Sequence, residues 1–358
     1  MRIKISSIVG ARPQFVKAAM VSKALLNSDI DENIIHTGQH FDKNMSEIFF
    51  EEMSIPKPSV NLGIGGGTHG ENTGRMIEGI EKILIDQKPD FVLVYGDTDS
   101  TLAGALSAAK LHIPIAHVES GLRSFNRKMP EEINRILTDH LSNILFAPSE
   151  NAVFNLKNEG IKKESIHFVG DIMYDATLHF AALAEKNSDI LNQLNIKSKE
   201  YMLASIHRAE NTNNLERLNA IVSSFKLFEE KIIFPVHPRT KEFLKKFKIK
   251  LPRNVIEIKP VGFIDMVMLE KNSMLIATDS GGVQKEAFFH KIPCVTLRDE
   301  TEWVELVESN WNQLVTPSSA SQIAKTYEKS IRSIGSDIYP YGNGDTADLI
   351  RNILEKIK

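Results

Sequence analysis

The sequence predicts an α/β protein made of two doubly wound parallel-sheet domains that face a central cleft. Three observations predict this class. Short apolar, β-branched runs alternate with helical patterns along the whole chain. The strand runs are continuously apolar rather than alternating, which is typical of parallel strands buried on both faces. With 358 residues, the chain also exceeds the size of about 250–300 residues at which single cores usually stop growing.

The first half alternates strand runs with helical runs, each strand ending at a turn-forming residue. The expected strands span residues 2–10, 32–38, 91–97, 113–119 and 143–149. The expected helices carry apolar residues at helical spacing, and they span residues 12–26, 42–53, 71–86, 99–111 and 131–141.

The second half repeats this organisation. Its expected strands span residues 201–208, 231–238, 254–260, 273–279 and 292–298, and its helices 213–230, 240–247, 265–271, 281–290 and 319–334. The pattern predicts an N-terminal domain, a connector, a C-terminal domain and a last helix that can pack back on the first domain. These span residues 1–170, 171–195, 196–340 and 341–358.

Composition limits the classes of partner and compartment. The net charge is −3, so no overall basic field attracts nucleic acid or an anionic membrane. No apolar run reaches the roughly 18 residues that span a bilayer. The lone cysteine, Cys294, excludes an internal disulfide framework and is expected to be a buried strand thiol. We therefore expect a cytoplasmic protein with neither nucleic acid nor membrane as partner.

The segment DSGGVQKEA, residues 279–287, indicates an anion-binding helix start. It follows a predicted strand, and Gly281 and Gly282 let the backbone approach a ligand. The free N–H groups and the positive end of the helix then favour phosphate. Ser280 adds a hydroxyl donor, and Glu286 can accept hydrogen bonds from ribose hydroxyls. The alternative is a turn that only joins strand and helix.

A second strand-to-helix junction, IVGARPQFVK, carries two cations, Arg12 and Lys17. Gly10 permits a tight turn, and Pro13 suits the first helical position. The alternative is a capped helix with surface basic residues. Junctions of phosphate character in both halves favour a ligand that bears a diphosphate.

Three carboxylates are expected at one edge of the first sheet. Asp97 ends one strand, Glu119 ends the next, and Glu131 begins a helix. Carboxyl ends of neighbouring parallel strands meet at one edge of a sheet. Mutual repulsion and partial burial would raise at least one pKa and place an acid beside a base. Helix capping is the alternative role of Asp97 and Glu131.

Two histidines, His207 and His237, each follow an apolar strand of the second half. A histidine there can donate to phosphate or move a proton, although a structural role is the alternative. No histidine or cysteine spacing indicates a metal, and the glycine-rich run 63–70 does not follow a strand as a dinucleotide fingerprint does. We therefore expect neither a metal nor a cofactor.

Ten motifs, in order, resemble the non-hydrolysing UDP-N-acetylglucosamine 2-epimerase family: GARPQFVKA, TGQH, GDTDST, HVESGLRSFN, MPEEINR, HRAEN, PVHPRT, TDSGGVQKEA, RDETEW and YPYGNGDTA. They extend over nearly the whole chain. The resemblance implies a GT-B-type pair of Rossmann-like domains and a homodimer that works without a cofactor. It also implies inversion at C2 of a UDP-linked acetamido sugar, by elimination of UDP to a 2-acetamidoglucal and re-addition of UDP.

The same resemblance assigns roles to individual residues. It implies that Asp97, Glu119 and Glu131 are catalytic carboxylates and that His207 is a catalytic histidine. The implied nucleotide contacts are Arg12, Ser280, Gly281, Gly282 and Glu286. It leaves open which carboxylate takes the C2 proton and which returns it.

A second ligand site is an open alternative. Gln39, His40, Arg75 and His237 lie in segments that match the family's site for an activating UDP-sugar. Ala209 stands where family members usually have a second arginine, which weakens this assignment.

Two substrates remain candidates. The GARPQF and TEWVEL variants resemble the branch that acts on UDP-2,3-diacetamido-2,3-dideoxyglucuronate, whereas UDP-N-acetylglucosamine members usually read GTRPE and DTTERPE. Arg123, Arg127 or Lys128 could pair with the C6 carboxylate of that sugar, or could form a solvated basic loop. Either product would feed surface-polysaccharide assembly.

Three other functions fit the same residues. They are a hydrolysing epimerase that releases N-acetylmannosamine and UDP, a glycosyltransferase on the same scaffold, and a UDP-sugar sensor without catalysis. They differ from a non-hydrolysing epimerase in whether two UDP-sugars reach equilibrium and whether C2 exchanges its hydrogen with solvent.

Overall fold

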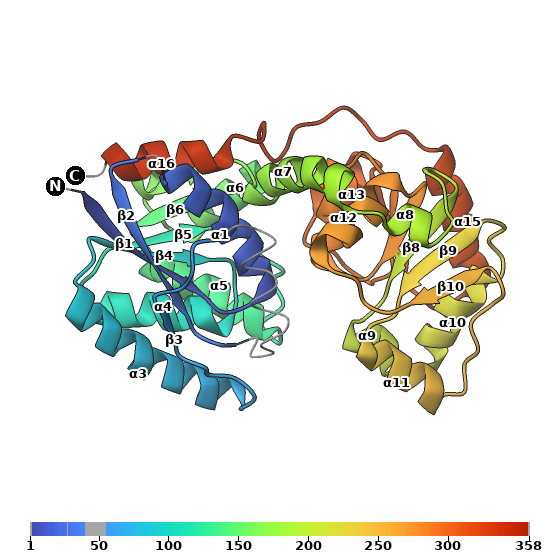
Figure 1. Cartoon of the computed structure of the whole chain (residues 1–358), viewed down its shortest axis with the longest axis horizontal. Coiled ribbons are helices and arrows are strands. Elements are labelled where there is room, and N and C mark those ends of the chain that lie inside the picture. The colour runs from blue at the N-terminus through green and yellow to red at the C-terminus, as the bar shows by residue number, and fades with distance from the viewer. Residues whose placement is uncertain (1, 27, 40–54, 357–358) are drawn as a thin grey trace. The chain divides into compact units, whose positions relative to one another are not determined.

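A computed structural model describes residues 2–26, 28–39 and 55–356, and the chain forms two compact units (Figure 1). Unit 1 contains residues 1–176 and 339–358, and unit 2 contains residues 177–338. The division falls inside helix α7, Ile172–Asn187, within the segment that the sequence pattern assigns to a connector.

Unit 1 is built on a seven-stranded sheet with the order β3-β2-β1-β4-β5-β6-β7. Neighbouring strands of this sheet pair in parallel. The order reverses direction after β1, as in doubly wound sheets, so the connections leave the sheet on both faces. The strands are β1 (Ile3–Val9), β2 (Ile30–His36), β3 (Val60–Asn61), β4 (Phe91–Tyr95), β5 (Ile115–Val118), β6 (Ile144–Ala147) and β7 (Ile166–Phe168).

Helices cover both faces of this sheet. Figure 1 shows α1 (Arg12–Leu25) and the C-terminal helix α16 (Thr346–Lys356) on one face, where they pack together. Helices α3 (His69–Gln87), α4 (Asp99–Lys110) and α5 (Pro130–Leu141) pack in series, and Figure 1 shows α3 and α4 on the opposite face. Helix α6 (Glu150–Asn158) and a 3-10 turn (Lys163–Ser165) lead into β7.

Unit 2 repeats the architecture on a six-stranded sheet with the order β10-β9-β8-β11-β12-β13, also paired in parallel. Its strands are β8 (Tyr201–Ser205), β9 (Lys231–Pro235), β10 (Val255–Ile258), β11 (Leu275–Thr278), β12 (Cys294–Thr296) and β13 (Asn312–Leu314). Its helices are α8 (Ile190–Gln193), α9 (Ala209–Thr212), α10 (Leu215–Phe225), α11 (Pro238–Lys246), α12 (Phe263–Asn272), α13 (Gly281–Phe289), α14 (Val304–Glu308) and α15 (Ala320–Arg332).

Strand β8 explains why the strand runs are continuously apolar. Met202 and Ala204 join the core cluster formed with α10 and α15. Tyr201 and Leu203 join the separate cluster formed with α12 and α13. Successive side chains point to opposite faces of a sheet, and here each face is covered by helices, so each position favours an apolar residue.

The doubly wound α/β prediction is confirmed for both units, with differences in detail. The sequence pattern misses the short strands β3, β7 and β13, because runs of two or three residues carry too little periodicity. Cys294 is a fully buried thiol on β12, as expected, and burial raises its pKa to about 12. The expected helix 42–53 lies outside the described residues. No helix within the described ranges is long and apolar enough to span a bilayer.

Candidate active site

The acidic edge of unit 1 consists of Asp97 and Glu119, which follow the neighbouring parallel strands β4 and β5. The glycine between β4 and Asp97 is needed here. Gly96 has φ +63°, and an added Cβ atom would lie 3.2 Å from both the Glu119 carboxylate and the Lys17 amine. Glu119 itself has φ +70°, a left-handed conformation that non-glycine residues rarely adopt. The turn therefore brings the two carboxylates to the same edge of the sheet.

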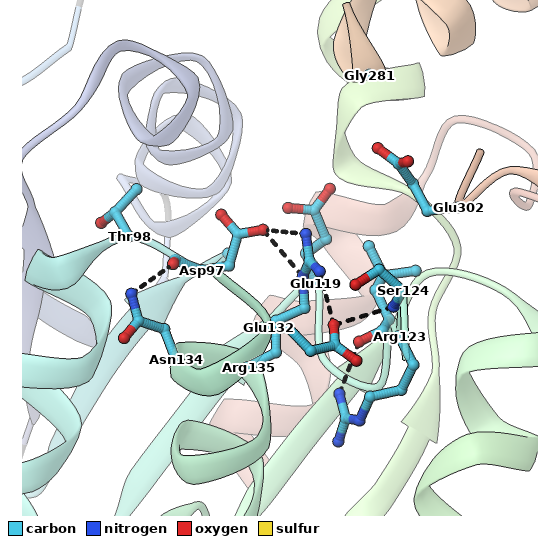
Figure 2. A network of polar contacts seen from close by, with 12 residues as sticks. Asp97, Thr98, Glu119, Arg123, Ser124, Glu132, Asn134, Arg135, Gly281 and Glu302 are labelled. Atoms are coloured by element: carbon cyan, nitrogen blue, oxygen red, sulfur yellow. Dashed lines mark hydrogen bonds and ion pairs between the residues drawn. The ribbon is translucent and has the colours of Figure 1, made fainter. Parts of the chain in front are cut away.

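Asp97 is held by a guanidinium. Nε and Nη2 of Arg135, on α5, donate to one carboxylate oxygen of Asp97 at 3.0 and 2.6 Å (Figure 2). The third nitrogen of Arg135 donates to Glu132 at 2.9 Å. Arg135 therefore forms ion pairs with two carboxylates, those of Asp97 and Glu132. The Asp97 side chain remains 30% exposed, open to a ligand.

The backbone around Asp97 is also fixed. The side-chain amide of Asn134 donates to the Asp97 carbonyl at 3.0 Å and to Asp99 at 3.2 Å. Thr98 caps helix α4 by accepting from the N–H of Thr101. Thus Thr98, and not Asp97, is the helix cap, and the Asp97 side chain is left to its contact with Arg135.

Glu119 forms an ion pair with Lys17, which α1 brings in from a position more than a hundred residues away in the chain. Both side chains are nearly buried, at 10% and 7% exposure. An ion pair in such surroundings feels a lower dielectric than one at the surface, so each partner favours the charged form of the other. The structure therefore places a cation beside each carboxylate of the acidic edge.

Glu131 and Glu132 are adjacent in sequence but differ in environment. Glu131 lies exposed in the first turn of α5. Glu132 is buried and accepts from the backbone N–H groups of Ser124 and Phe125 at 2.9 and 2.8 Å. Burial opposes ionisation of Glu132, but these N–H groups and Arg135 lower its pKa overall. Glu132 anchors the loop that follows Glu119, a role that sequence reasoning did not assign.

The remaining candidates of unit 1 have diverse surroundings. Gln39 accepts from the backbone and hydroxyl of Ser100 at 3.2 and 2.7 Å. Arg75 is exposed and lies 3.9 Å from Glu71 on the same helix. Arg123, considered for a sugar carboxylate, is instead buried in ion pairs, whereas Arg127 and Lys128 are exposed. His40 and the side chain of Arg12 lie outside the described structure.

In unit 2 the Ser280 junction, residues 279–282, connects β11 to α13. Ser280 is the N-cap residue of α13, and its side chain makes no capping hydrogen bond. An added Cβ atom on Gly281 would lie 2.5 Å from the Glu302 carboxylate, whereas one on Gly282 would meet nothing within 4 Å. A side chain at position 281 would have to displace the Glu302 carboxylate, whereas position 282 leaves open space at the helix start. The first-turn N–H groups of such a helix suit an anion.

Asp279 organises the loop that carries His207. Its fully buried carboxylate accepts from the backbone N–H groups of His207 and Arg208 at 3.0 and 3.1 Å, and from Asn211 at 3.0 Å. The ring of His207 is partly exposed, and its centroid lies 5.9 Å from that of His237. His237 is exposed and caps α11. Asp279 thus links the Ser280 junction to His207, a role that its place beside Ser280 could have indicated.

Glu286, the expected ribose acceptor, is partly exposed on α13 and hydrogen-bonded to Glu270 of α12. Glu270 is almost fully buried. Burial raises the pKa of both carboxyls, and the charge of Glu286 raises that of Glu270 further.

The described residues contain no group of three or more histidine, cysteine, aspartate or glutamate side chains suited to a metal ion. The acidic edge offers carboxylates for proton transfer, and the Ser280 junction offers the free N–H groups of a helix start for anion binding.

Comparison with known proteins adds to this geometry. Residues 23–355 match the family described as UDP-N-acetylglucosamine 2-epimerase. The chain is 54% identical to a UDP-N-acetylglucosamine 2-epimerase homolog of Methanococcus maripaludis, over 99% of this chain and 100% of that protein. It is 49% identical to the UDP-2,3-diacetamido-2,3-dideoxy-D-glucuronate 2-epimerase of Pseudomonas aeruginosa, with the same coverage.

The fold matches solved structures over the whole chain. One is the UDP-GlcNAc 2-epimerase of Methanocaldococcus jannaschii in complex with UDP-GlcNAc and UDP, with a TM-score of 0.91 and 48% identity over 99% of each chain.

Proposed function

The chain belongs to the UDP-N-acetylglucosamine 2-epimerase family, and from this premise we propose that it inverts C2 of a UDP-linked 2-acetamido sugar without hydrolysing it. The observation that carries the proposal is the acidic edge, where Asp97 and Glu119 each lie beside a cation at neighbouring strand ends. Such groups suit the removal and return of a proton.

The chemistry proceeds in two balanced halves. A carboxylate takes the C2 proton while the C1–O bond breaks, UDP leaves with the bonding electrons, and a C1–C2 double bond forms. UDP then adds back to C1, and a proton is delivered to C2 on the opposite face. We assign these proton transfers to Asp97, Glu119 and Glu131, because two different faces of C2 require separately placed groups.

The departing diphosphate needs its own stabilisation. We assign this to Ser280, to the N–H groups of Gly281 and Gly282, and to His207, since preorganised donors stabilise charge that develops on a leaving group. Glu286 accepts from the ribose hydroxyls, and Arg12 contacts the nucleotide. At the acidic edge, the ion pair of Lys17 with Glu119 supports the role of Glu119 in proton transfer.

The two relatives with different substrates define the candidates for the sugar. UDP-2,3-diacetamido-2,3-dideoxy-D-glucuronate and UDP-N-acetylglucosamine differ at C3 and C6, away from the reacting C2. The identities of 49% to the Pseudomonas aeruginosa enzyme and 48% to the Methanocaldococcus jannaschii enzyme do not distinguish the two sugars, so the GARPQF and TEWVEL motifs carry the preference for the diacetamido sugar. Exposed Arg127 and Lys128 are the cations available for its C6 carboxylate. We further propose a cytoplasmic homodimer that serves surface-polysaccharide synthesis.

Proton NMR with both UDP-sugars side by side tests this function. We expect an equilibrium of two C2 epimers of one UDP-sugar, with deuterium from D₂O entering at C2. Stoichiometric free sugar and UDP would instead indicate a hydrolysing enzyme. Transfer of the sugar to an acceptor, without exchange of the C2 hydrogen with solvent, would indicate a glycosyltransferase. Binding of UDP without turnover of either UDP-sugar would indicate a sensor.

A further inference from the structure

A second buried network lies directly behind the acidic edge. His117 is on β5, two residues before Glu119, and is fully buried. Its partner Asp139, on α5, is also fully buried. Neither side chain reaches solvent, so neither can act on a substrate itself. Their hydrogen bonds instead go to backbone groups that flank Asp97 and Glu119.

His117 fixes the turn before Asp97. Its Nε2 atom lies 2.7 Å from the carbonyl oxygen of Gly96. The N–H of Gly96 in turn donates to the carbonyl of Val118 at 3.0 Å. The peptide group on each side of Gly96 is therefore tied to β5, and the direction in which Asp97 leaves the sheet is set by these two bonds.

Asp139 fixes the chain on both sides of Glu119. One carboxylate oxygen lies 2.7 Å from Nδ1 of His117, before Glu119. The other accepts from the N–H of Gly121 at 3.0 Å, after Glu119. Gly121 is itself confined, because an added Cβ atom would lie 2.5 Å from the carbonyl of Ala152. The Asp139 carboxylate thus binds on both sides of Glu119, the residue with the left-handed backbone conformation.

The conformation of Glu119 makes this arrangement necessary. A non-glycine residue at φ +70° costs on the order of 1 kcal/mol or more, and it persists only where the surrounding structure enforces it. The hydrogen bonds from His117 and Gly121 to the same carboxylate supply that enforcement. Without them the backbone could relax, and the Glu119 side chain would move away from its position beside Lys17.

The hydrogen bonds also define the charge of the network. A carbonyl oxygen can only accept, so Nε2 of His117 carries a proton. Burial opposes ionisation of Asp139, but the hydrogen bonds and charges of His117 and Arg123 lower its pKa overall. With Asp139 as a carboxylate, which can only accept, Nδ1 is the donor of the bond between the two side chains. Arg123 and Glu159, in a bidentate pair at 2.7 Å, complete a balanced set of charges.

We propose that His117 and Asp139 are positioning residues, a charged buried pair that holds Asp97 and Glu119 in their reactive orientation. This inference rests on the proposed function, since it gives those two carboxylates their role. It explains why a costly buried ion pair lies here, where an apolar pair of similar volume would cost less.

Paired variants of Asp139 test the inference through kinetics. Asp139→Ala should lower kcat about 100-fold while KM and the Kd of UDP change less than about threefold, since small misplacements of reacting groups cost rate more than affinity. Asp139→Asn can still accept from Gly121 and donate to a neutral His117, so it should recover at least about tenfold of that loss. Equal activity in both variants and wild type overturns the proposal.

Asp175→Ala is the matched control. Asp175 is also a buried carboxylate of unit 1, and it accepts from the backbone N–H of Ala347 at 2.9 Å, at the start of α16. Asp175→Ala should lower Tm, as Asp139→Ala should, but it should leave kcat unchanged. For each variant, the loss of kcat is compared with the loss of Tm. If the ratio of these two losses is the same for Asp139→Ala and Asp175→Ala, the role of Asp139 is structural only and the proposal fails.

A second measurement does not depend on activity. Nitrogen-15 NMR of the histidine rings at pH 7–8, with His117 assigned by its loss in His117→Gln, should show protons on both ring nitrogens. A ring nitrogen of His117 without a proton overturns the charged pair, even if Asp139→Ala does not fold. If wild-type protein turns over neither UDP-sugar while both protons are present, the proposed function fails and the charged pair stands.

Discussion

The acidic edge of unit 1 and the Ser280 junction of unit 2 both lie where strands end, but they are held in different ways. At the acidic edge the two carboxylates are themselves paired with cations: Asp97 pairs with Arg135, and Glu119 with Lys17. At the Ser280 junction, one buried carboxylate, Asp279, holds backbone N–H groups of the His207 loop. Ser280 itself caps nothing with its side chain.

This difference follows from the chemistry proposed for each place. Proton transfer needs charges of defined position, and a charge in a partly buried place requires a partner. Binding a diphosphate needs neutral donors that are already oriented, and a fixed backbone supplies them. Substitutions should therefore change rate in unit 1 and affinity in unit 2.

The largest expected effect comes from Asp97→Asn. It removes the charge paired with Arg135 but keeps the size of the side chain, so kcat should fall about 10²–10⁴-fold, the usual contribution of a general acid or base. The Kd of UDP, measured by calorimetry, should stay within about threefold. Asp90→Asn is the control, because Asp90 lies just before β4 and its carboxylate accepts from the backbone N–H of Lys4. A kcat that matches the control removes Asp97 from the reaction.

Asp279→Ala should act on the other region. It leaves the N–H groups of His207 and Arg208 and the amide of Asn211 without their buried acceptor. Each buried donor left unpaired costs about 1–3 kcal/mol, so the free energy of unfolding should fall by about 3 kcal/mol. UDP should bind at least about tenfold more weakly. Unchanged affinity would show that the His207 loop does not contribute to the nucleotide site.

Acid should change the stability of unit 2 through one buried histidine. Burial, with the charges of Lys271 and Lys199, lowers the pKa of His290 in unit 2 to about 4. Between pH 6.5 and 4 the unfolded chain binds a proton at His290 that the folded chain does not, so the contribution of His290 to stability should fall by up to about 3 kcal/mol in this window, whereas the raised pKa of Glu270 and Glu286 adds stability there. Asp139 of unit 1 has a lowered pKa, so its contribution is lost only below the ordinary value of 3.8.

Hydrogen exchange at pH 7 and pH 4.5, corrected for intrinsic rates, measures this difference. Relative to pH 7, peptides of unit 2 should lose more protection at pH 4.5 in the wild type than in His290→Gln, since a glutamine does not titrate. Equal losses in wild type and variant would contradict the assignment to His290.

The smallest effect is expected from Ser280→Ala. The loss of one ordinary hydrogen bond should weaken UDP binding by about 0.5–1.5 kcal/mol. Calorimetry against Ser273→Ala provides the comparison, because Ser273 lies before β11 and donates to the Glu270 carbonyl. Identical affinities for the two variants would mean that the Ser280 hydroxyl makes no phosphate contact.

Part of the site follows from local rules that sequence alone expresses. Residues after parallel strands meet at one edge of a sheet, so Asp97 and Glu119 could be placed together from their positions in the chain. The same rule places His207 and Ser280 at the ends of the neighbouring strands β8 and β11. Continuous apolar runs gave the fold class, because strands covered on both faces have no polar side.

Other parts depend on packing between distant segments. Lys17 reaches Glu119 only because α1 packs against the sheet that carries β5. Glu131 and Glu132 look alike in the sequence, yet one is exposed and the other anchors a loop. Gly281 also lies against the Glu302 carboxylate, from a segment about twenty residues later in the chain, which the local sequence does not show.

The sequence by itself determined the two doubly wound units and the strand ends where reactive groups lie, because periodicity and chain order are local properties. Only the tertiary structure decided which cation neutralises which carboxylate, that His117 and Asp139 lie behind the acidic edge, and that burial and mutual contact raise the pKa of Glu270 and Glu286. Electrostatic partners are set by separations of a few ångströms between segments far apart in the chain, and no pattern of residues along the chain encodes those separations.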